Sequence, residues 1–413
     1  MTFLIPSHAD RPADDPIFAL NAEARARAAA GEPVINATVG ALLDDAGKLA
    51  VIGAVTEALR EVPPGAGAGY APIGGSADFL RAVAADLFGG ASDGPDFGWA
   101  ASAATPGGTG ALHLAIKNFL EPGQALLTSS FYWGPYKTLA DESGRTLETF
   151  RMFDERGRLD TADLSKRLEG QLGRQGRALL FLNSPCHNPT GYSFDDAEWQ
   201  AVVGALREQA PRGPIAVVLD VAYARYGATD LRAVVERTRE LTEGRHAQVL
   251  YAWSASKSFT QYGLRVGALV ALHPDEAERR RLESAFSYSC RGTWSNCNAG
   301  GMAAITRVVT DPALRARVDR ERASLKALLD GRVARWNELA APQGLRYPRY
   351  DGGFFTTVFC DDAPAAALRL KAEGVFVVPQ AGALRVALCS VAERDVPRLV
   401  EALGRHVKPP AGP

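Results

Sequence analysis

Residues 215–220 read Ile-Ala-Val-Val-Leu-Asp, an apolar run that ends on a single carboxylate. Continuous rather than alternating hydrophobicity is typical of strands covered on both faces, as in the parallel sheets of α/β proteins. Helical periodicity separates such runs, for example at 195–208, where Ser193 and Asp196 have the spacing of a capping box. Other short apolar runs predict further strands at 124–129, 146–153, 178–183, 249–253 and 266–272. The sequence therefore predicts a central α/β domain built on a parallel sheet.

The pattern changes after about residue 300. Residues 303–339 are predicted to be helical with a break before Pro312, and residues 342–387 are strand-like and rich in glycine. A last helix follows Ser390, and residues 21–30 near the N-terminus form a helical segment too short to be a domain. We expect a large domain at 46–312, a small domain built from both chain ends at 12–45 and 313–413, and an N-terminal arm at 1–11.

Composition excludes several classes of protein. The chain has 413 residues, of which 46% are hydrophobic and 23% charged, and its formal net charge of −1 offers no broad basic surface for nucleic acid or an anionic membrane. Its longest apolar stretches, such as 266–272, are far shorter than the roughly 20 residues of a membrane-spanning helix. The N-terminus lacks the layout of a secretory signal, so a cytoplasmic protein is expected. Five scattered cysteines without a Cys-x-x-Cys pair predict neither a disulfide framework nor a zinc or other metal site.

Lys257 lies in the segment Trp253-Ser-Ala-Ser-Lys-Ser-Phe259, directly after a predicted strand. A lysine at the end of a buried strand is costly unless it is bonded, and one use for it is a Schiff base to an aldehyde cofactor, with Arg265 eight residues on to bind a phosphate. The alternative is a lysine whose ammonium group reaches solvent from the strand end. Ser254 and Lys257 also fit the Ser-x-x-Lys of penicillin-binding proteins, but the Ser-Asp-Asn and Lys-Thr-Gly elements of those proteins are absent.

Asp220 ends its predicted strand at the position where α/β proteins bind ligands. A buried carboxylate needs a cationic partner, and a protonated pyridine nitrogen would satisfy it. The carboxylate would in turn keep that proton on the ring, so that a pyridine cofactor remains an electron sink. Tyr223, three residues later, could reach a ring oxygen. An ordinary helix-capping Asp and a half-buried Tyr also account for these residues individually.

Two loops carry further polar candidates. Gly107 and Gly108 open an amphipathic helix, where a phosphate can approach the backbone and bind to helix-terminal amides. The cluster matches neither Gly-x-Gly-x-x-Gly nor Gly-x-x-x-x-Gly-Lys, so dinucleotide or nucleoside triphosphate binding has little support. Asn188 lies between two Pro-containing turns, where its amide can donate to an oxygen of a ring or substrate. Cys186 and His187 are adjacent and point to opposite sides, so they are not expected to form a catalytic pair.

Taken together, these segments resemble the aspartate and aromatic amino acid aminotransferases, the class I branch of the fold type I pyridoxal 5′-phosphate (PLP) enzymes. The resemblance runs from Asp15-Pro-Ile-Phe18 through residues 35–40 and 70–75 to Arg385. It implies an α/β fold with a mostly parallel seven-stranded sheet between helices and a small α+β domain. It also implies a PLP-dependent enzyme that moves an amino group between an L-amino acid and a 2-oxo acid in two half-reactions.

The resemblance also implies roles for single residues. Lys257 is similar to the lysine that holds PLP covalently and moves the substrate proton, and Asp220, Tyr223 and Asn188 match the residues that hold the ring. Trp133 corresponds to the aromatic side chain stacked on the ring. The phosphate is expected to be bound by Gly107, Gly108, Thr109, Ser254 and Arg265, with Tyr70 contributed by a second subunit. This implies a homodimer with shared active sites.

Two arginines are expected to select the substrate. Arg385 looks like the fork for the α-carboxylate, a bidentate contact that a lysine could not reproduce. Arg291, which by itself would be read as a solvated surface residue, matches the arginine that reaches across the dimer to a distal carboxylate. Aspartate, glutamate and aromatic amino acids are therefore the expected substrates. Ile17, Gly40, Trp133 and Asn188 are expected to lie around the substrate.

The sequence departs from the family pattern and leaves other activities open. Tyr136 stands where the family commonly has a histidine behind the cofactor aspartate, and Gly107 stands where aspartate enzymes often have a serine. A β-lyase or decarboxylase of the same fold remains an alternative, because small positional differences direct the shared carbanion chemistry. A non-catalytic PLP-binding protein and, less well supported, an NAD-dependent dehydrogenase are the others.

Overall fold

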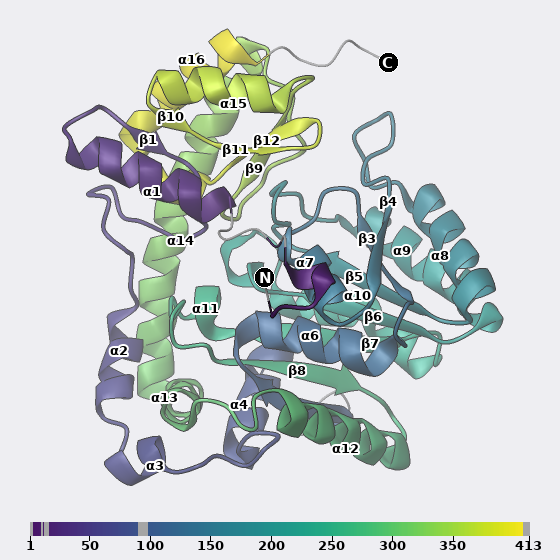
Figure 1. Cartoon of the computed structure of the whole chain (residues 1–413). Coiled ribbons are helices and arrows are strands. Elements are labelled where there is room, and N and C mark those ends of the chain that lie inside the picture. The colour runs from purple at the N-terminus through teal and green to yellow at the C-terminus, as the bar shows by residue number, and fades with distance from the viewer. Residues whose placement is uncertain (1–2, 10, 12–15, 90–97, 408–413) are drawn as a thin grey trace. The chain divides into compact units, whose positions relative to one another are not determined.

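The structure, a computed structural model, describes residues 3–9, 11, 16–89 and 98–407 (Figure 1). Parts of the expected N-terminal arm, and residues 12–15 and 408–413 of the expected small domain, lie outside this range. The described residues fall into two compact units. Of the described residues, the smaller unit contains 3–9, 11, 16–49, 331–347 and 355–407, and the larger contains 50–89, 98–330 and 348–354.

Seven strands of the described residues form one sheet in the larger unit, in the order β2-β8-β7-β6-β5-β3-β4. All are parallel except β8, which is antiparallel to both of its neighbours. The six predicted strands are confirmed, and β2 is an addition that its small Ala and Ser residues did not signal. Their bounds are β2 (Ala100–Thr105), β3 (Ala125–Ser129), β4 (Thr146–Phe150), β5 (Ala178–Asn183), β6 (Ile215–Asp220), β7 (Gln248–Ser254) and β8 (Gly267–Leu272).

Both faces of this sheet are covered by helices (Figure 1). Alternate residues of β5 show this, because Leu180 and Leu182 belong to one apolar cluster and Leu179 and Phe181 to another. One face packs against α6 (Gly107–Phe119), α7 (Pro135–Glu142) and α12 (Glu276–Thr293), and the other against α4 (Ala77–Phe88), α8 (Thr161–Gln175), α9 (Asp196–Gln209), α10 (Leu231–Glu243) and α13 (Ala299–Thr310). The remaining helical segments are α2 (Gly53–Arg60), α3 (Pro64–Ala68), α11 (Ala255–Ser258), η2 (Ala210–Arg212) and η3 (Ala224–Tyr226).

The first turn of α9 differs from the sequence prediction. Asp195, not Ser193, is the N-cap residue, and it accepts a hydrogen bond from the backbone N–H of Glu198 at 2.9 Å. The Glu198 carboxylate accepts in return from the N–H of Asp195, which completes a capping box two residues later than predicted. Glu198 is nearly buried and is also bonded by Arg158 and Arg349, so tertiary contacts favour this register.

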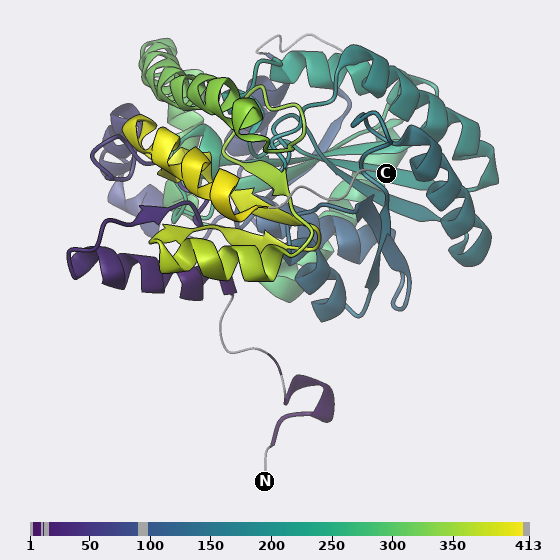
Figure 2. The same cartoon turned by 90° about the horizontal axis from the view of Figure 1, so that it is seen from above.

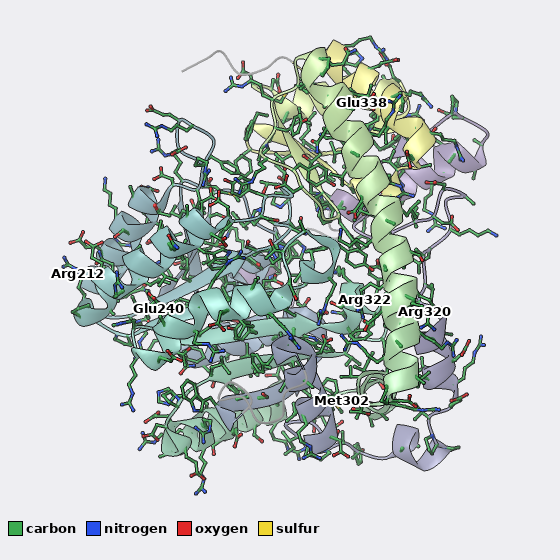
Figure 3. All side chains as sticks on the ribbon, turned by 180° about the vertical axis from the view of Figure 1, so that it is seen from behind. Arg212, Glu240, Met302, Arg320, Arg322 and Glu338 are labelled. Atoms are coloured by element: carbon green, nitrogen blue, oxygen red, sulfur yellow. The ribbon has the colours of Figure 1, made fainter. Side chains whose placement is uncertain are left out.

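Helix α14 (Pro312–Ala340) is the longest helix of the described chain, and it begins at the predicted break (Figure 3). Its residues through Asp330 belong to the larger unit and the rest to the smaller unit. Arg320 and Arg322, both labelled in Figure 3, differ in environment, because Arg320 is exposed whereas Arg322 is buried and donates through Nε to the carbonyl of Ser258 at 2.7 Å.

The smaller unit joins segments from the two ends of the chain (Figure 2). Strand β1 (Ile35–Asn36) pairs in parallel with β10 (Val375–Phe376), and a second, antiparallel sheet has the order β11-β12-β9. Residues 342–387 are not wholly strand-like as predicted, because they contain α15. The other bounds are β9 (Thr356–Phe359), β11 (Val378–Gln380), β12 (Ala383–Val386), α1 (Pro16–Ala29), α15 (Ala363–Ala372), α16 (Val396–His406), η1 (Pro6–His8), η4 (Ala341–Gln343), η5 (Leu388–Ser390) and η6 (Glu393–Asp395).

Among the residues that the structure describes, no helix combines the length and the apolar character needed to cross a membrane.

Candidate active site

The carboxyl ends of three neighbouring parallel strands meet at one cavity of the larger unit. Asn183 ends β5 and lies opposite Asp220, which ends β6, and Ser254 ends β7. Ligands of α/β proteins bind at such strand ends. The cavity has a volume of about 180 Å³, and its lining consists of Gly108, Thr109, Leu112, Trp133, Asn183, Asn188, Asp220, Ala222, Tyr223, Ser254, Ser256, Lys257 and Arg265. The structure thus brings together nine of the residues predicted from the sequence.

Asp220 supplies the carboxylate of the cavity lining. It is 8% exposed, and burial raises the pKa of its side chain. Two donors and a nearby cation oppose that effect. The Tyr136 hydroxyl donates to Oδ2 at 2.7 Å, the N–H of Ala222 donates to Oδ1 at 3.2 Å, and the charge of Lys257 also favours the ionised form. Asp220 can therefore face a cationic ligand as a carboxylate.

Lys257 lies on the short helix α11, which begins immediately after β7. The Ser254 side chain caps this helix by accepting from the N–H of Ser256 at 3.1 Å. The Lys257 side chain is half-buried, and its Nζ atom lies 5.5 Å from the ring centre of Tyr223 and 5.8 Å from that of Tyr262. Lys257 therefore points its amine into the cavity between aromatic rings, rather than extending it into bulk solvent.

One end of the cavity is built to bind an anion. Gly108 and Thr109 lie in the first turn of α6, where unpaired backbone N–H groups favour negative charge. Arg265 adds a guanidinium that donates through Nη1 to Ser256 Oγ at 3.2 Å and to the Tyr262 carbonyl at 2.8 Å. Gly107 has a φ of +74°, and a Cβ atom there would lie 2.4 Å from Nη2 of Arg265. Gly107 therefore lets the guanidinium approach the backbone, although it does not itself line the cavity.

Asn188 and Asn183 form the polar wall of the cavity. Asn188 donates through Nδ2 to the Tyr223 hydroxyl at 3.3 Å, and its backbone N–H donates to Asn183 Oδ1 at 2.6 Å. Asn183 also donates through Nδ2 to the Asp220 carbonyl at 2.7 Å, so it ties the wall to β6. Sequence reasoning missed Asn183 as a site residue. Its position at the end of β5, level with Asp220, was the signal that could have identified it.

Five other predicted residues are not among those that line this cavity. Tyr70 is 97% exposed. Arg291 is exposed on α12, where its Nη1 donates to Ser295 Oγ at 2.7 Å. Ile17 and Gly40 belong to the smaller unit, as does Arg385. The structure of the single chain therefore leaves the predicted roles of these five residues as predictions.

Arg385 is held firmly within the smaller unit. It lies on β12, is 4% exposed, and donates through Nη2 to the Thr38 carbonyl at 2.5 Å. Its guanidinium carbon lies 4.7 Å from the ring centre of Phe355. A Cβ atom on Gly40 would lie 2.4 Å from the same ring, so Gly40 leaves the space that Phe355 occupies. Phe355 is a supporting residue that sequence reasoning did not identify.

The groups around the cavity fit PLP. The buried Oδ1 atom of Asn188 has no hydrogen-bond partner among the described residues, so it can accept a hydrogen bond from a ligand in the cavity. The carboxylate of Asp220 suits a protonated ring nitrogen, and the α6 terminus with Arg265 suits a phosphate. The amine of Lys257 belongs to the same cavity lining and suits an aldehyde.

Comparison with known proteins identifies the family. The family model described as aminotransferase class I and II matches residues 32–403. The chain belongs to the class I and II aminotransferases. Its aminotransferase activity and its dependence on PLP, both expected from the sequence, are thereby confirmed. The dehydrogenase alternative has no support in these comparisons.

This aminotransferase resembles both aspartate and aromatic enzymes. It is 30% identical to an aspartate aminotransferase of Pseudomonas aeruginosa over 336 residues, which cover 79% of this chain and 81% of the relative. A solved structure of an aminotransferase from Anaerococcus prevotii has 31% identity and a TM-score of 0.91, over 99% of this chain and 100% of that one. An aromatic-amino-acid aminotransferase from Burkholderia pseudomallei, solved covalently bound to pyridoxal phosphate, has 26% identity and a TM-score of 0.79, over 98% of this chain and 100% of that one.

Proposed function

We propose that this aminotransferase transfers the amino group of an acidic or aromatic L-amino acid to a 2-oxo acid by a ping-pong mechanism. The single observation that carries the proposal is one cavity that holds the amine of Lys257, the carboxylate of Asp220 and the anion-binding end formed by α6 and Arg265. The names of the aspartate and aromatic relatives support the two substrate classes.

Each residue of the cavity has a proposed task. PLP, when bound, supplies an electron sink for the charge left at the substrate Cα atom after that atom loses its proton. Lys257 Nζ takes this proton and returns it during the half-reaction. Asp220 holds a proton on the ring nitrogen, and Tyr223 and Asn188 donate to the ring oxygen. Trp133 covers the ring face. Gly108, Thr109, Ser254 and Arg265 hold the phosphate, and Gly107 leaves room for Arg265 beside them.

Substrate selection is assigned to arginines outside the cavity lining. The buried and stacked Arg385 is suited to the α-carboxylate, because Thr38 and Phe355 fix its planar fork within the smaller unit. Arg291 is proposed to bind a distal carboxylate in the active site of a partner subunit. Tyr70 is likewise proposed to contact the phosphate of the PLP that is bound in the partner subunit. These assignments require a homodimer, and cytoplasmic location remains part of the proposal.

The covalent role of Lys257 is tested by spectroscopy. Purified wild-type protein with PLP should show a pH-sensitive visible absorption band and should be labelled irreversibly after borohydride reduction. Lys257→Ala should lose the label and the transamination of every amino acid, whereas Lys166→Ala, which removes an exposed lysine outside the cavity, should keep both. Borohydride labelling that persists at wild-type level in Lys257→Ala would overturn the assignment.

The distal-carboxylate role of Arg291 is tested by comparing two substrates. Loss of a hydrogen-bonded charge pair costs about 1.5–3 kcal/mol, so Arg291→Ala should lower kcat/KM for aspartate roughly tenfold to a hundredfold. The value for phenylalanine, which has no distal carboxylate, should change far less. Arg280→Ala is the matched control, because Arg280 is also an exposed arginine on α12. An equal loss for aspartate and phenylalanine in Arg291→Ala would show that the role is wrong.

A further inference from the structure

Tyr136 makes a direct contact with the carboxylate of Asp220 from outside the cavity. It lies in the first turn of α7, is 1% exposed, and is not among the residues that line the cavity. Its hydroxyl donates to Asp220 Oδ2 at 2.7 Å, across 84 positions of the sequence. Asp220 is therefore held from behind by a neutral side chain of the α7 layer.

The packing of Tyr136 fixes the direction of that hydroxyl. Its ring contacts Phe181 edge-on, with ring centres 5.2 Å apart and planes at 82°. It also contacts Trp133 edge-on at 5.8 Å and 89°. Phe181 belongs to β5, and Trp133 lines the cavity. A ring held between these two aromatics cannot turn its hydroxyl away from Asp220 without disturbing the wall of the cavity.

The charges around Asp220 show what the contact does. The titratable groups that act on Asp220 are Tyr136 from α7 and Lys257 from α11, and Tyr223, from the loop after β6, acts on Tyr136. Burial and the Asp220 charge raise the pKa of Tyr136 well above its usual value, so the hydroxyl remains a donor across the working pH range. Burial raises the pKa of Asp220, and the hydrogen bond from Tyr136 is the largest effect that opposes it. Without this donor, more of the carboxyl would be protonated and unable to hold a proton on a ring nitrogen.

We propose that Tyr136 is a positioning residue for transamination, whose hydroxyl keeps Asp220 oriented and ionised toward the ring nitrogen of PLP. The inference deepens the proposed function and rests on the role given there to Asp220. It assigns to a tyrosine the place that the sequence pattern of the family commonly gives to histidine. Because tyrosine is neutral, the support for Asp220 adds no second charge that titrates near neutral pH.

The test uses the PLP-loaded enzyme and the variant Tyr136→Phe, which keeps the ring and its packing. Loss of a hydrogen bond to a charged group predicts a fall in kcat of roughly tenfold to a hundredfold with little change in KM for the amino acid. PLP should dissociate more readily. The midpoint pH of the visible band should rise. A positively charged ring repels a positive charge at Lys257, so when the ring loses its charge, the positive charge at Lys257 persists to higher pH. Tyr136→His, which restores a donor, should recover much of the lost kcat.

Tyr192→Phe is the matched control. Tyr192 is also fully buried and also donates to a nearly buried carboxylate, that of Glu198, but neither residue lines the cavity. This variant should keep the wild-type kcat and the wild-type absorption band. If Tyr136→Phe behaves like Tyr192→Phe in kcat, PLP affinity and band midpoint, the inference is overturned.

The variant Asp220→Asn separates this inference from the proposed function. If Asp220→Asn retains wild-type kcat and spectrum, the proposed role of Asp220 fails. If Asp220→Asn is impaired while Tyr136→Phe is not, the role of Asp220 stands and that of Tyr136 fails. The double variant should be no worse than Asp220→Asn alone, because Tyr136 acts through Asp220. Losses that multiply in the double variant would contradict this route.

Discussion

Gly107 shows how one residue prepares the phosphate end of the cavity. Its φ of +74° is costly for any residue with a Cβ atom, and an added Cβ would lie 2.4 Å from Nη2 of Arg265 and 2.8 Å from its Cζ. Gly107→Ala should therefore displace Arg265 and weaken PLP binding at least about tenfold, the scale of one lost charge-assisted contact. Equilibrium titration of the apoprotein with PLP measures this change.

Gly157→Ala separates backbone strain from the contact with Arg265. Gly157 has a φ of +72°, but a Cβ atom there would meet nothing within 4 Å. Both variants should lose about 1–2 kcal/mol of stability from the left-handed backbone. Only Gly107→Ala should lose affinity for PLP. Equal PLP affinities in the two variants would show that the space beside Arg265 is unimportant.

At the scale of elements, a buried carboxylate joins α14 to the α4 and β7 layers of the larger unit. The Asp86 side chain on α4 is 1% exposed and bonds Arg225 and Arg315, each at 2.8 Å. It also accepts from Trp253 Nε1 on β7 at 2.9 Å. Burial alone would raise the pKa of Asp86, but Arg225, Arg315 and the buried Arg322 reverse that effect and lower it. Asp86 is therefore ionised in the folded protein at neutral pH.

Replacing Asp86 should destabilise the fold rather than alter the chemistry. Asp86→Asn leaves the partly buried Arg225 and Arg315 without their buried counter-ion and should lower the free energy of unfolding by about 3–5 kcal/mol in denaturant titrations at pH 7. Asp319→Asn is the matched control, because Asp319 pairs with Arg315 and Arg322 but is half-exposed, and its loss should stay within about 1 kcal/mol. A loss in Asp86→Asn no larger than in the control would contradict this account.

The same pair of variants gives a pH dependence with a defined sign. A carboxylate whose pKa is lowered by folding stabilises the protein above the pKa of the unfolded chain, about 4 for aspartate. That contribution disappears as the pH falls through the lower pKa of the folded state. The stability difference between wild type and Asp86→Asn should therefore be constant from about pH 5 to 8 and shrink below about pH 4. A difference that grows on acidification would contradict the lowered pKa of Asp86.

For the whole molecule, the proposed shared active sites can be tested by mixing two inactive variants. Lys257→Ala inactivates the active site of its own chain, whereas Tyr70→Ala is proposed to inactivate the active site of the partner subunit. A mixed dimer then has one intact site out of two. Random exchange of subunits makes about half of the dimers mixed, so about a quarter of all sites should be active and up to about a quarter of the wild-type activity should return. Activity is measured before and after co-refolding of the two variants.

The control mixture combines Lys257→Ala with Asp220→Asn. Both residues line the cavity of one chain, so neither site of the mixed dimer is intact and no activity should return. Recovery in the Tyr70 mixture but not in the control would establish that Tyr70 acts across subunits. Absence of recovery in both mixtures would count against the contribution of Tyr70 in trans.

Local sequence patterns were sufficient to predict most strands of the central sheet and the family of this protein. Apolar runs of strand length predicted six of the strands, because residues buried on both faces of a sheet leave a continuous apolar pattern. Residues that directly follow these runs share one edge of a parallel sheet, so the sequence alone placed Asp220 and Lys257 in one site, and both line the same cavity. The identity of the family followed from the order of these segments and is confirmed by comparison.

Packing decided what local patterns could not. The Tyr136–Asp220 hydrogen bond and the contact of Gly107 with Arg265 join residues far apart in the chain, so no local spacing encodes them. The small residues of β2 carry weak strand propensity, and the strand forms because β8 offers a partner along its whole length. The sequence thus determined which chemical groups the site would contain. Only the tertiary structure decided which side chains support them, because support depends on distances set by the packing of helices against the sheet.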